Sequence, residues 1–244
     1  AQNLPADGIA FFPKDGGKCE ELYEEYTGNK RLFGLEATGG ELYMTAQNIT
    51  AGPGGSEFDL VCQDGESIHC ATKLLGKHNI MNILGCAACA RSMGMEMQKI
   101  ADGIAEAQPV EHRLQLIDNN TGVLVIDDAF NSNPAGTQAA MEVLGMFEGM
   151  RKICVTPGMV ELGDDEEKEN RAFGTRMGTV CDIVILVGKK RTQPIMRGLL
   201  DAGFDERMVF RASNLDEATA IMGELTMPGD VILFENDLPD NYEE

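Results

Sequence analysis

The sequence lacks several short motifs that identify an active site by themselves. It contains neither a GxxxxGK[ST] phosphate-binding loop nor a GxGxxG dinucleotide-binding turn. It also has no GxSxG nucleophile elbow and no recognisable pairing of a catalytic cysteine with a histidine. A functional site must therefore be sought in the polar residues that the fold gathers together.

Basic residues are scarce. Twenty Lys and Arg face forty Asp and Glu, which gives a formal net charge of −20. Because such a surface repels nucleic-acid phosphates and anionic lipids, we expect no nucleic-acid partner. No apolar run approaches the ~20 residues of a membrane span, and no signal peptide opens the chain. We therefore expect a cytoplasmic protein without membrane insertion.

The cysteines follow no disulfide framework, since the seven of them form an odd set without regular spacing. Cys86 and Cys89 form a CxxC, but the surrounding GCAACA is typical of the small-residue face of a helix. No second pair or histidine cluster completes a zinc site. The sequence predicts buried free thiols and no metal ligands.

A length of 244 residues suggests two domains of ~100–150 residues each. The first 72 residues alternate short strand candidates with polar or glycine-rich turns, and some strands have the half-buried pattern of antiparallel pairing. Helices are expected near 18–26, 79–91 and 97–106. Pro109 prevents continuation of the last helix, so we place the junction at 108–113 and predict domains 1–110 and 111–244.

The second half alternates strands and helices regularly. Strands are expected at 123–127, 151–156, 183–187, 208–210 and 230–235, with helices between them. This order predicts an α/β domain with a Rossmann-like, doubly wound, mainly parallel sheet, preceded by a partial α/β segment with antiparallel strands. We expect the first three of these strands to be adjacent and parallel.

The stretch 121–134, TGVLVIDDAFNSNP, is the strongest candidate for a site. A short apolar strand ends there in Asp127 and Asp128, and Asn133 can cap a helix that begins at Pro134. In open α/β sheets, ligands bind beyond the carboxyl ends of the strands. The two carboxylates could equally do no more than organise a turn. Loops at 156–158, 188–189 and 235–237 should share this edge.

Three further groups have two possible roles each. Asn79 and Asn82 lie three residues apart, so their amides share one face of the first helical turn, where they can cap the helix or meet a ligand. Arg113 is either a surface arginine or a bidentate phosphate ligand beside the junction. Lys189 and Lys190 are either a solvated pair or a contact for an anionic substrate.

Five ordered motifs resemble the Mur ligase family. They are GKHNIMN (76–82), EHRLQLI (111–117), VIDDAFNSNP (125–134), PGMVELG (157–163) and DIVILVG (182–188). Residues 1–74 resemble the late part of the family's central domain. Mur ligases have an N-terminal UDP-substrate domain, a central P-loop ATPase domain and a C-terminal Rossmann-like domain. The resemblance implies that the P-loop, the Mg²⁺ ligands and a modified lysine precede Ala1.

The resemblance also implies an activity. Such enzymes use ATP and Mg²⁺ to activate a carboxylate as an acyl phosphate, which an amine then displaces. The expected substrates are a UDP-MurNAc-peptide and an amino acid or dipeptide such as D-Ala-D-Ala, in the synthesis of the peptidoglycan cell wall. We expect the complete enzyme to be a monomer whose domains close on the nucleotide. The 244 residues alone should be inactive.

Residue roles follow from the same resemblance. Asn79 and Asn82 would approach the adenine, with His78 beside them. Asp128 would bind the ribose, and Arg113 would reach the γ-phosphate as the catalytic residue. The residues expected to bind the substrate, including the loop that would hold the incoming amine, are Asn131, Asn133, Gly158, Glu161 and Lys189.

Two departures from the family pattern bear on the amine. PGM stands where close relatives often have GDM, which removes an aspartate at Gly158. The chain ends in FENDLPDNYEE (234–244), where the standard enzyme has a Lys-Gly-Ser turn. Two alternatives therefore stay open: another amide ligase of the superfamily, similar to folylpolyglutamate or cyanophycin synthetases, and a non-catalytic Mur-like binding module.

Overall fold

The computed structural model describes residues 4–5, 7–14, 17–35, 42–52, 54–130 and 132–236. The chain divides into two compact units, Ala1–Gln108 and Pro109–Glu244, and each is considered by itself. The last helix of the first unit ends at Glu106, three residues before Pro109. Proline lacks the N–H that a continued helix would need, so the helix ends there.

The first unit is built on a five-stranded mixed sheet in the order β1-β2-β3-β4-β5. β1, β2 and β3 pair in parallel, and β3, β4 and β5 pair in antiparallel. The elements are β1 (Ala10–Pro13), α1 (Lys18–Glu25), β2 (Lys30–Leu35), β3 (Met44–Gly52), β4 (Gly55–Cys62), β5 (Ser67–Thr72), α2 (Lys77–Ser92) and α3 (Met97–Glu106).

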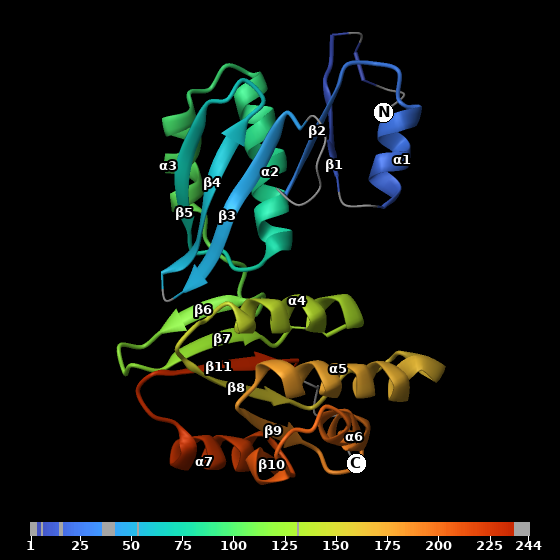
Figure 1. Cartoon of the computed structure of the whole chain (residues 1–244), viewed down its shortest axis with the longest axis vertical. Helices are drawn as coiled ribbons and strands as arrows, with labels where there is room; N and C mark the ends of the chain where they lie inside the picture. The colour runs from blue at the N-terminus through green and yellow to red at the C-terminus, as the bar shows by residue number, and fades with distance from the viewer. Residues whose placement is uncertain are drawn as a thin grey trace. The chain divides into compact units, whose positions relative to one another are not determined.

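Strand alternation and helix periodicity produce the core of this unit. Met44 of β3 and Phe58 and Leu60 of β4 point to one face of the sheet, where none of the three is exposed. Ile80 and Leu84, four residues apart on α2, belong to the same buried core cluster as these three residues. α3 packs beside β5 and against α2, as the upper part of Figure 1 shows.

The second unit contains a six-stranded sheet in the order β10-β9-β8-β11-β7-β6. Its pairs are all parallel except β6 with β7, which confirms the predicted mainly parallel α/β fold. Its strands are β6 (Gln115–Asp118), β7 (Leu124–Asp128), β8 (Arg151–Thr156), β9 (Ile183–Val187), β10 (Val209–Ala212) and β11 (Asp230–Glu235). Its helices are α4 (Pro134–Gly145), α5 (Glu166–Val180), α6 (Gln193–Asp201) and α7 (Leu215–Leu225), with short 3-10 turns η2 (Gly163–Asp165) and η3 (Glu206–Met208).

One expectation about strand order is wrong. β8 and β9 are adjacent and parallel, but β7 is separated from β8 by the last strand, β11. β11 is buried on both faces, with Val231 and Leu233 enclosed on one face and Ile232 buried on the other, and so it takes a central place in the sheet. The sequence order of the strands carries no sign of this insertion.

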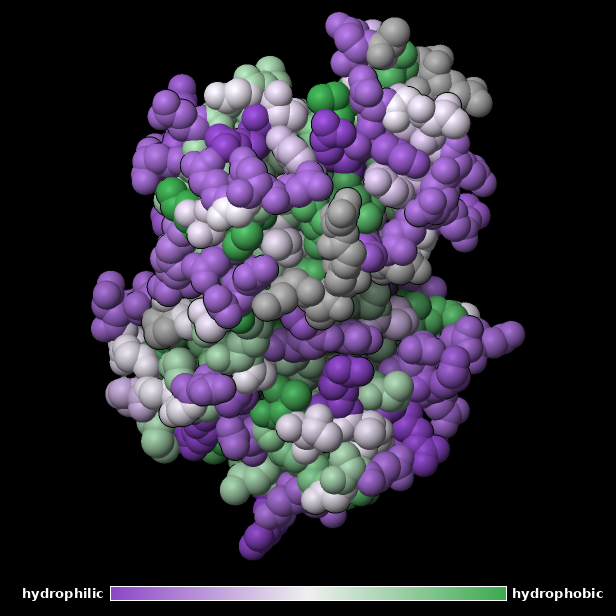
Figure 2. Space-filling model, turned by 45° about the horizontal axis from the view of Figure 1, so that its top comes forward, coloured by the Kyte–Doolittle hydropathy of each residue, from purple (hydrophilic) through white to green (hydrophobic). Residues whose placement is uncertain are grey.

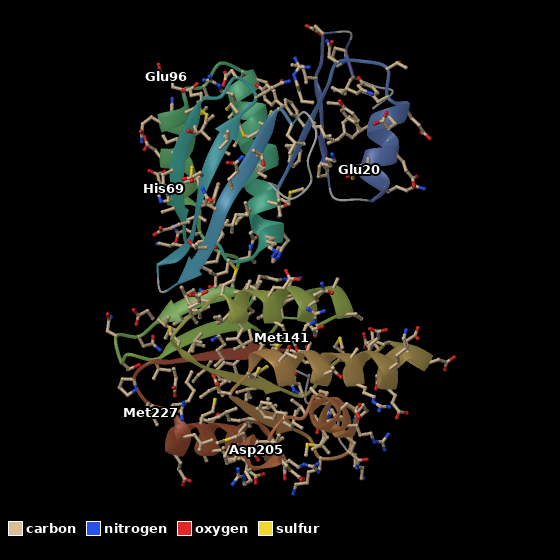
Figure 3. The ribbon with its side chains drawn as sticks, in the orientation of Figure 1. Glu20, His69, Glu96, Met141, Asp205 and Met227 are labelled. Atoms are coloured by element: carbon tan, nitrogen blue, oxygen red, sulfur yellow. The ribbon has the colours of Figure 1, made fainter. Side chains whose placement is uncertain are left out.

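Helices cover both faces of this sheet (Figure 1). On one face, Ala218 and Met222 of α7 pack against Ile153, Ile183 and Ile232. The alternate residues of the same strands face the opposite side, where α4, α5 and α6 pack together. Met141 of α4, labelled in Figure 3, is fully buried.

The cysteine prediction is correct in part. Cys62, Cys70, Cys154 and Cys181 are buried free thiols, and Cys19 is half-buried. Cys86 and Cys89 are exposed, contrary to expectation. α2 turns its larger apolar residues toward the core, and this leaves both cysteines on its outer side.

The described surface is predominantly polar. Figure 2 shows hydrophilic residues over most of the visible face, with hydrophobic residues in scattered patches. Within the described ranges, no helix combines the length and the apolar character needed to cross a bilayer.

Candidate functional site

Parallel strands bring polar residues together at one edge of the six-stranded sheet. β7 ends in Asp127 and Asp128, β8 in Thr156 and β11 in Glu235. The strand register sets Glu235 beside Asp128. The carboxyl ends of neighbouring parallel strands meet at the same edge, so this cluster follows directly from the topology.

Glu235 lies at the centre of a buried cluster and is only 1% exposed. Ser132 donates a hydrogen bond to Oε1, and the Thr156 hydroxyl donates one to Oε2 at 3.2 Å. Burial raises the pKa of Glu235 to about 7. The negative charge of Asp128 adds to this rise, while the two hydroxyl bonds oppose it.

The loop after β8 is fixed by buried amides. Gly158 N–H donates to Thr156 Oγ1 at 2.9 Å, and Asn236 Nδ2 donates to Gly158 O at 2.7 Å. The Asn170 side chain accepts from Met159 N–H at 2.9 Å and donates to Met159 O at 2.8 Å. The start of the loop 157–163 is therefore held in place by buried hydrogen bonds to the rest of the domain.

Gly158 has a conformation that explains its identity. Its φ is +84°, and a Cβ there would stand 2.8 Å from Asn170 Oδ1 and 3.0 Å from Ile195 Cδ1. A side chain such as aspartate would need both neighbours to move, and it would occupy a strained backbone conformation. The close packing of the loop and its positive φ thus both require glycine at this position.

The two successive carboxylates hold different partners. Asp128 Oδ1 accepts a bond from Leu114 N–H at 3.1 Å. Asp127 Oδ2 lies 2.8 Å from His112 Nδ1, and its Oδ1 accepts from Ala129 N–H at 3.2 Å. Both carboxylates therefore organise the neighbouring backbone, whatever ligand they also meet.

The pKa of Asp128 is set by its burial and by the charged and polar groups around it. Burial raises its pKa, and the charge of Asp127 adds to this. The bond from Leu114 N–H and the charge of Arg113 act in the opposite direction. A carboxylate has a second oxygen, which can accept bonds from a sugar hydroxyl.

Arg113 lies beside this pair on the segment that leads into β6. Its guanidinium carbon is 4.4 Å from the centroid of the Phe130 ring, which is a cation–π contact. Phe130 is 63% exposed, and Arg113 is also exposed. A hollow of about 540 Å³ adjoins them, lined by His112, Val125, Asp127, Ala129, Phe130, Leu215, Phe234 and Asn236.

In the first unit, the predicted asparagines lie at the start of α2. Asn79 is half-buried, and its Nδ2 donates to Leu75 O at 2.8 Å, while Asn82 and His78 are exposed. Both asparagines line a mainly apolar groove of about 380 Å³ between α2 and α3. His78 is not part of that lining. The position of Asn79 thus has a local structural role in closing the turn before the helix.

The remaining predicted residues have separate positions. Asn133 caps α4, as expected, by accepting a bond from Gly136 N–H at 2.9 Å. Glu161 is exposed and has a φ of +64°. Lys189 is exposed after β9. Hydrogen bonds with Ser213 lower the pKa of Glu217, and the charge of Lys189 lowers it further. Asn131 lies outside the described residues. Their proposed contacts with a substrate stay predictions.

The described carboxyl groups at this edge are poorly suited to a metal ion. In the part of the chain that the structure describes, no three His, Cys, Asp or Glu residues gather as cation ligands. The Glu235 carboxyl is enclosed by hydroxyl donors, and its raised pKa disfavours the charge that Mg²⁺ needs. Arg113 and Asp128 offer a guanidinium for a phosphate and a carboxylate for a sugar.

Neither Glu235 nor Asn170 was singled out as an individual site residue from the sequence. Glu235 ends an apolar strand as Asp128 does, so strand-end position was a usable signal for it. The buried Asn170 lies inside a helix, and its partner at Met159 is set by tertiary packing. Nothing in the sequence pattern distinguishes Asn170 from a surface residue.

Comparison with known domains gives two matches. The Mur ligase middle domain matches residues 1–90, and the Mur ligase glutamate ligase domain matches residues 112–235. One match thus falls in each compact unit.

Two similar proteins are D-alanyl-D-alanine-adding ligases. The chain is 31% identical over 188 residues to the UDP-N-acetylmuramoyl-tripeptide–D-alanyl-D-alanine ligase of Escherichia coli (strain K12), covering 77% of this chain and 41% of that one. It is also 31% identical over 234 residues to the enzyme of the same name from Bacillus subtilis (strain 168), covering 95% of this chain and 49% of that one. The chain therefore spans less than half the length of these two relatives.

A solved structure has the same fold. The MurF ligase of Thermotoga maritima, in complex with ADP, superposes with a TM-score of 0.76 at 20% identity, covering 95% of this chain and 50% of that one. With a family domain matched in each unit and relatives at 31% identity, the chain belongs to the Mur ligase family.

Proposed function

We propose that this chain supplies the later central and C-terminal domains, 1–110 and 111–244, of an ATP-dependent ligase that joins D-Ala-D-Ala to a UDP-MurNAc-tripeptide. The observation that carries the proposal is the proximity of Arg113 to Asp128 at the carboxyl edge of the sheet, where burial raises the pKa of Asp128 and the charge of Arg113 acts against this rise. Asp128 accepts a hydrogen bond from Leu114, the residue after Arg113, so the carboxylate lies beside the segment that carries the arginine. The names of the E. coli and B. subtilis relatives supply the substrate class.

The nucleotide roles come from the family resemblance, and the chemistry of these side chains is compatible with them. The Asp128 carboxylate would accept bonds from the ribose hydroxyls, and the Arg113 guanidinium would bind the γ-phosphate. The amides of Asn79 and Asn82 can both donate to and accept from a purine edge, with His78 beside them. When bound, ATP supplies the phosphoryl group that activates the substrate carboxylate.

The amine step would use residues of the second unit. The loop 157–163 begins in a buried hydrogen-bond network and continues to the exposed Glu161, which suits a carboxylate that meets an ammonium group. Asn131, Asn133, Gly158 and Lys189 complete the proposed substrate contacts. Mg²⁺ ligands would come from the remainder of the protein, which we expect to be a cytoplasmic monomer.

Asp128→Ala tests the nucleotide role in the full-length protein. The affinity for ATP should fall by ~1–3 kcal/mol, because a charge-assisted bond to a hydroxyl is lost. Binding is measured by calorimetry, and folding is checked by circular dichroism. Asp118→Ala, at the exposed end of β6, is the matched control and should leave ATP affinity unchanged.

The same preparation tests the reaction. Phosphate release should require both UDP-MurNAc-tripeptide and D-Ala-D-Ala. Release with glutamate in place of the dipeptide would favour a folylpolyglutamate-like specificity. Intact ATP binding without any turnover would favour a non-catalytic module.

A further inference from the structure

Arg113 lies between two residues with left-handed backbone. His112 has a φ of +59° and Leu114 a φ of +45°. Residues other than glycine seldom adopt this conformation, because Cβ approaches the neighbouring carbonyl oxygen. We call residues 112–114 the arginine arch. Such a conformation persists only where surrounding contacts hold it.

The contacts that hold the arginine arch come from the end of β7. Asp127 Oδ2 lies 2.8 Å from His112 Nδ1 before the arginine, and Asp128 Oδ1 accepts from Leu114 N–H at 3.1 Å after it. Asp127 thus contacts the residue before Arg113, and Asp128 contacts the residue after it. The backbone adds a third contact, because Phe130 N–H donates to His112 O at 3.2 Å.

Arg113 itself makes two contacts, one through its backbone and one through its side chain. Its N–H donates to Val110 O at 3.2 Å, and its guanidinium packs on the Phe130 ring at 4.4 Å. The Asp127 side chain is only 18% exposed, whereas that of His112 is 56% exposed. Asp127 is therefore the anchored member of its pair, and His112 is the member that would move if the pair were broken.

We propose that His112 and Asp127 are positioning residues, which hold the arginine arch so that the Arg113 guanidinium is presented to a phosphate. This inference rests on the proposed function, in which Arg113 meets the γ-phosphate. Neither residue needs to touch the nucleotide. A displacement of about 1 Å at such a group can lower the rate by about a hundredfold, so an ordered arch has a measurable effect on turnover.

The chain offers a matched control. His69 on β5 and Asp59 on β4 form a second imidazole–carboxylate pair, with Nδ1 and Oδ1 3.0 Å apart. This pair is exposed and belongs to the first unit; His69 is labelled in Figure 3. Its removal tests the loss of such a pair without any effect on the arginine arch.

The variants are His112→Asn and Asp127→Ala, with His69→Asn and Asp59→Ala as controls. Asparagine tolerates left-handed backbone better than most residues, so the first variant removes the ring with little added strain. The order of the Arg113 Nε–Hε bond is measured by ¹⁵N NMR relaxation in the 244-residue chain, together with its thermal midpoint. The kcat and the KM for ATP are measured in the full-length protein.

We expect both arch variants to lower the Arg113 order and to reduce kcat by about tenfold to a hundredfold, with KM for ATP changing less. The double variant should be no worse than the more impaired single variant, since the two residues act as one unit. Asp127→Asn keeps an acceptor for the imidazole N–H and should recover part of the rate. The control variants should change neither quantity.

Unchanged Arg113 order and unchanged kcat in both arch variants would overturn the proposal. A fall in kcat that merely follows a lower thermal midpoint, with Arg113 still ordered, would also overturn it. Arg113→Ala separates the two levels of the argument. If Arg113→Ala keeps full kcat while the arch variants disorder Arg113, the proposed role of Arg113 in the reaction is wrong. The claim that His112 and Asp127 order the arginine would then still hold.

Discussion

Glu235 is enclosed by protein at a point where three strands end. Its carboxyl group has hydroxyl partners from Ser132 and Thr156, and its pKa is raised to about 7 from an ordinary value of 4.5. The native state therefore retains this proton at pH values where the unfolded chain has released it. Between about pH 4.5 and 7, stability consequently falls as the pH rises.

Glu235→Gln should remove this dependence. Glutamine keeps the shape and can hydrogen-bond both hydroxyls, but it carries no charge. The free energy of unfolding of the variant relative to the natural chain should rise by about 3 kcal/mol between pH 4.5 and 7.5. Urea titrations followed on isoleucine methyl resonances of the six-stranded sheet measure it. With the exposed Glu148→Gln as control, a difference that stays constant across this range would contradict the assignment.

Gly158 gives a second test at the residue scale. Gly158→Ala places a Cβ 2.8 Å from Asn170 Oδ1 in a backbone conformation with φ +84°, so it combines strain with a clash. Gly149 has a φ of +73° and open space around it, so Gly149→Ala measures strain alone. The control should cost roughly 1–2 kcal/mol, and Gly158→Ala should cost at least about 1 kcal/mol more.

Thermal or urea unfolding of the two alanine variants measures this difference. Equal losses would show that the loop 157–163 can move away from Asn170. The predicted close packing at the start of that loop would then be wrong.

At the scale of elements, β8 and β11 are tied together at their first residues. Arg151 donates to Asp230 through Nε at 2.8 Å and Nη2 at 2.7 Å, and Met227 N–H donates to the same carboxylate at 2.8 Å. Asp230 is 1% exposed. Burial pushes its pKa up, but the bonds from Arg151 and Met227 bring it below the ordinary value.

Asp230→Ala should lower the free energy of unfolding by about 3–5 kcal/mol, since it leaves the Arg151 charge without its buried partner. Arg207→Ala removes an exposed pair with Asp205 and should cost far less. Asp205 is labelled in Figure 3. Equal costs in urea unfolding would mean that the β8–β11 tie contributes no more than a surface ion pair.

Local elements were predictable from the sequence where apolar periodicity was strong. α3 and β11 have the predicted bounds of 97–106 and 230–235, and α2 begins at Lys77 rather than Asn79. Strand pairing was less accessible. Neither the parallel pairing of β1 to β3 nor the place of β11 between β7 and β8 follows from local pattern, because burial by distant segments decides both.

The site was predictable to the same extent. Asp127 and Asp128 were identified from their position after a buried strand, and Asn133 from its place before Pro134. Their partners at His112 and Leu114 depend on the antiparallel addition of β6 to β7. A tertiary pairing of this kind cannot be read from the spacing of either segment alone.

At the scale of the whole molecule, charge and motif content set what the 244 residues can do alone. A net charge of −20 opposes the capture of a polyphosphate, and the sequence contains no GxxxxGK[ST] loop. Phosphoryl transfer depends on a phosphate cradle and on neutralisation by Mg²⁺. In the proposed enzyme, those parts belong to the remainder of the protein.

The central claim is that these residues form the adenosine end and the γ-phosphate arginine of a Mur ligase, without its phosphate cradle. The most direct measurement titrates ATP·Mg²⁺ into the 244-residue chain and into the full-length protein by calorimetry, with phosphate release assayed in parallel. The claim predicts millimolar or undetectable binding and no turnover for the chain. For the full-length protein, it predicts phosphate release that requires UDP-MurNAc-tripeptide and D-Ala-D-Ala. Micromolar binding or steady phosphate release by the 244-residue chain would contradict it.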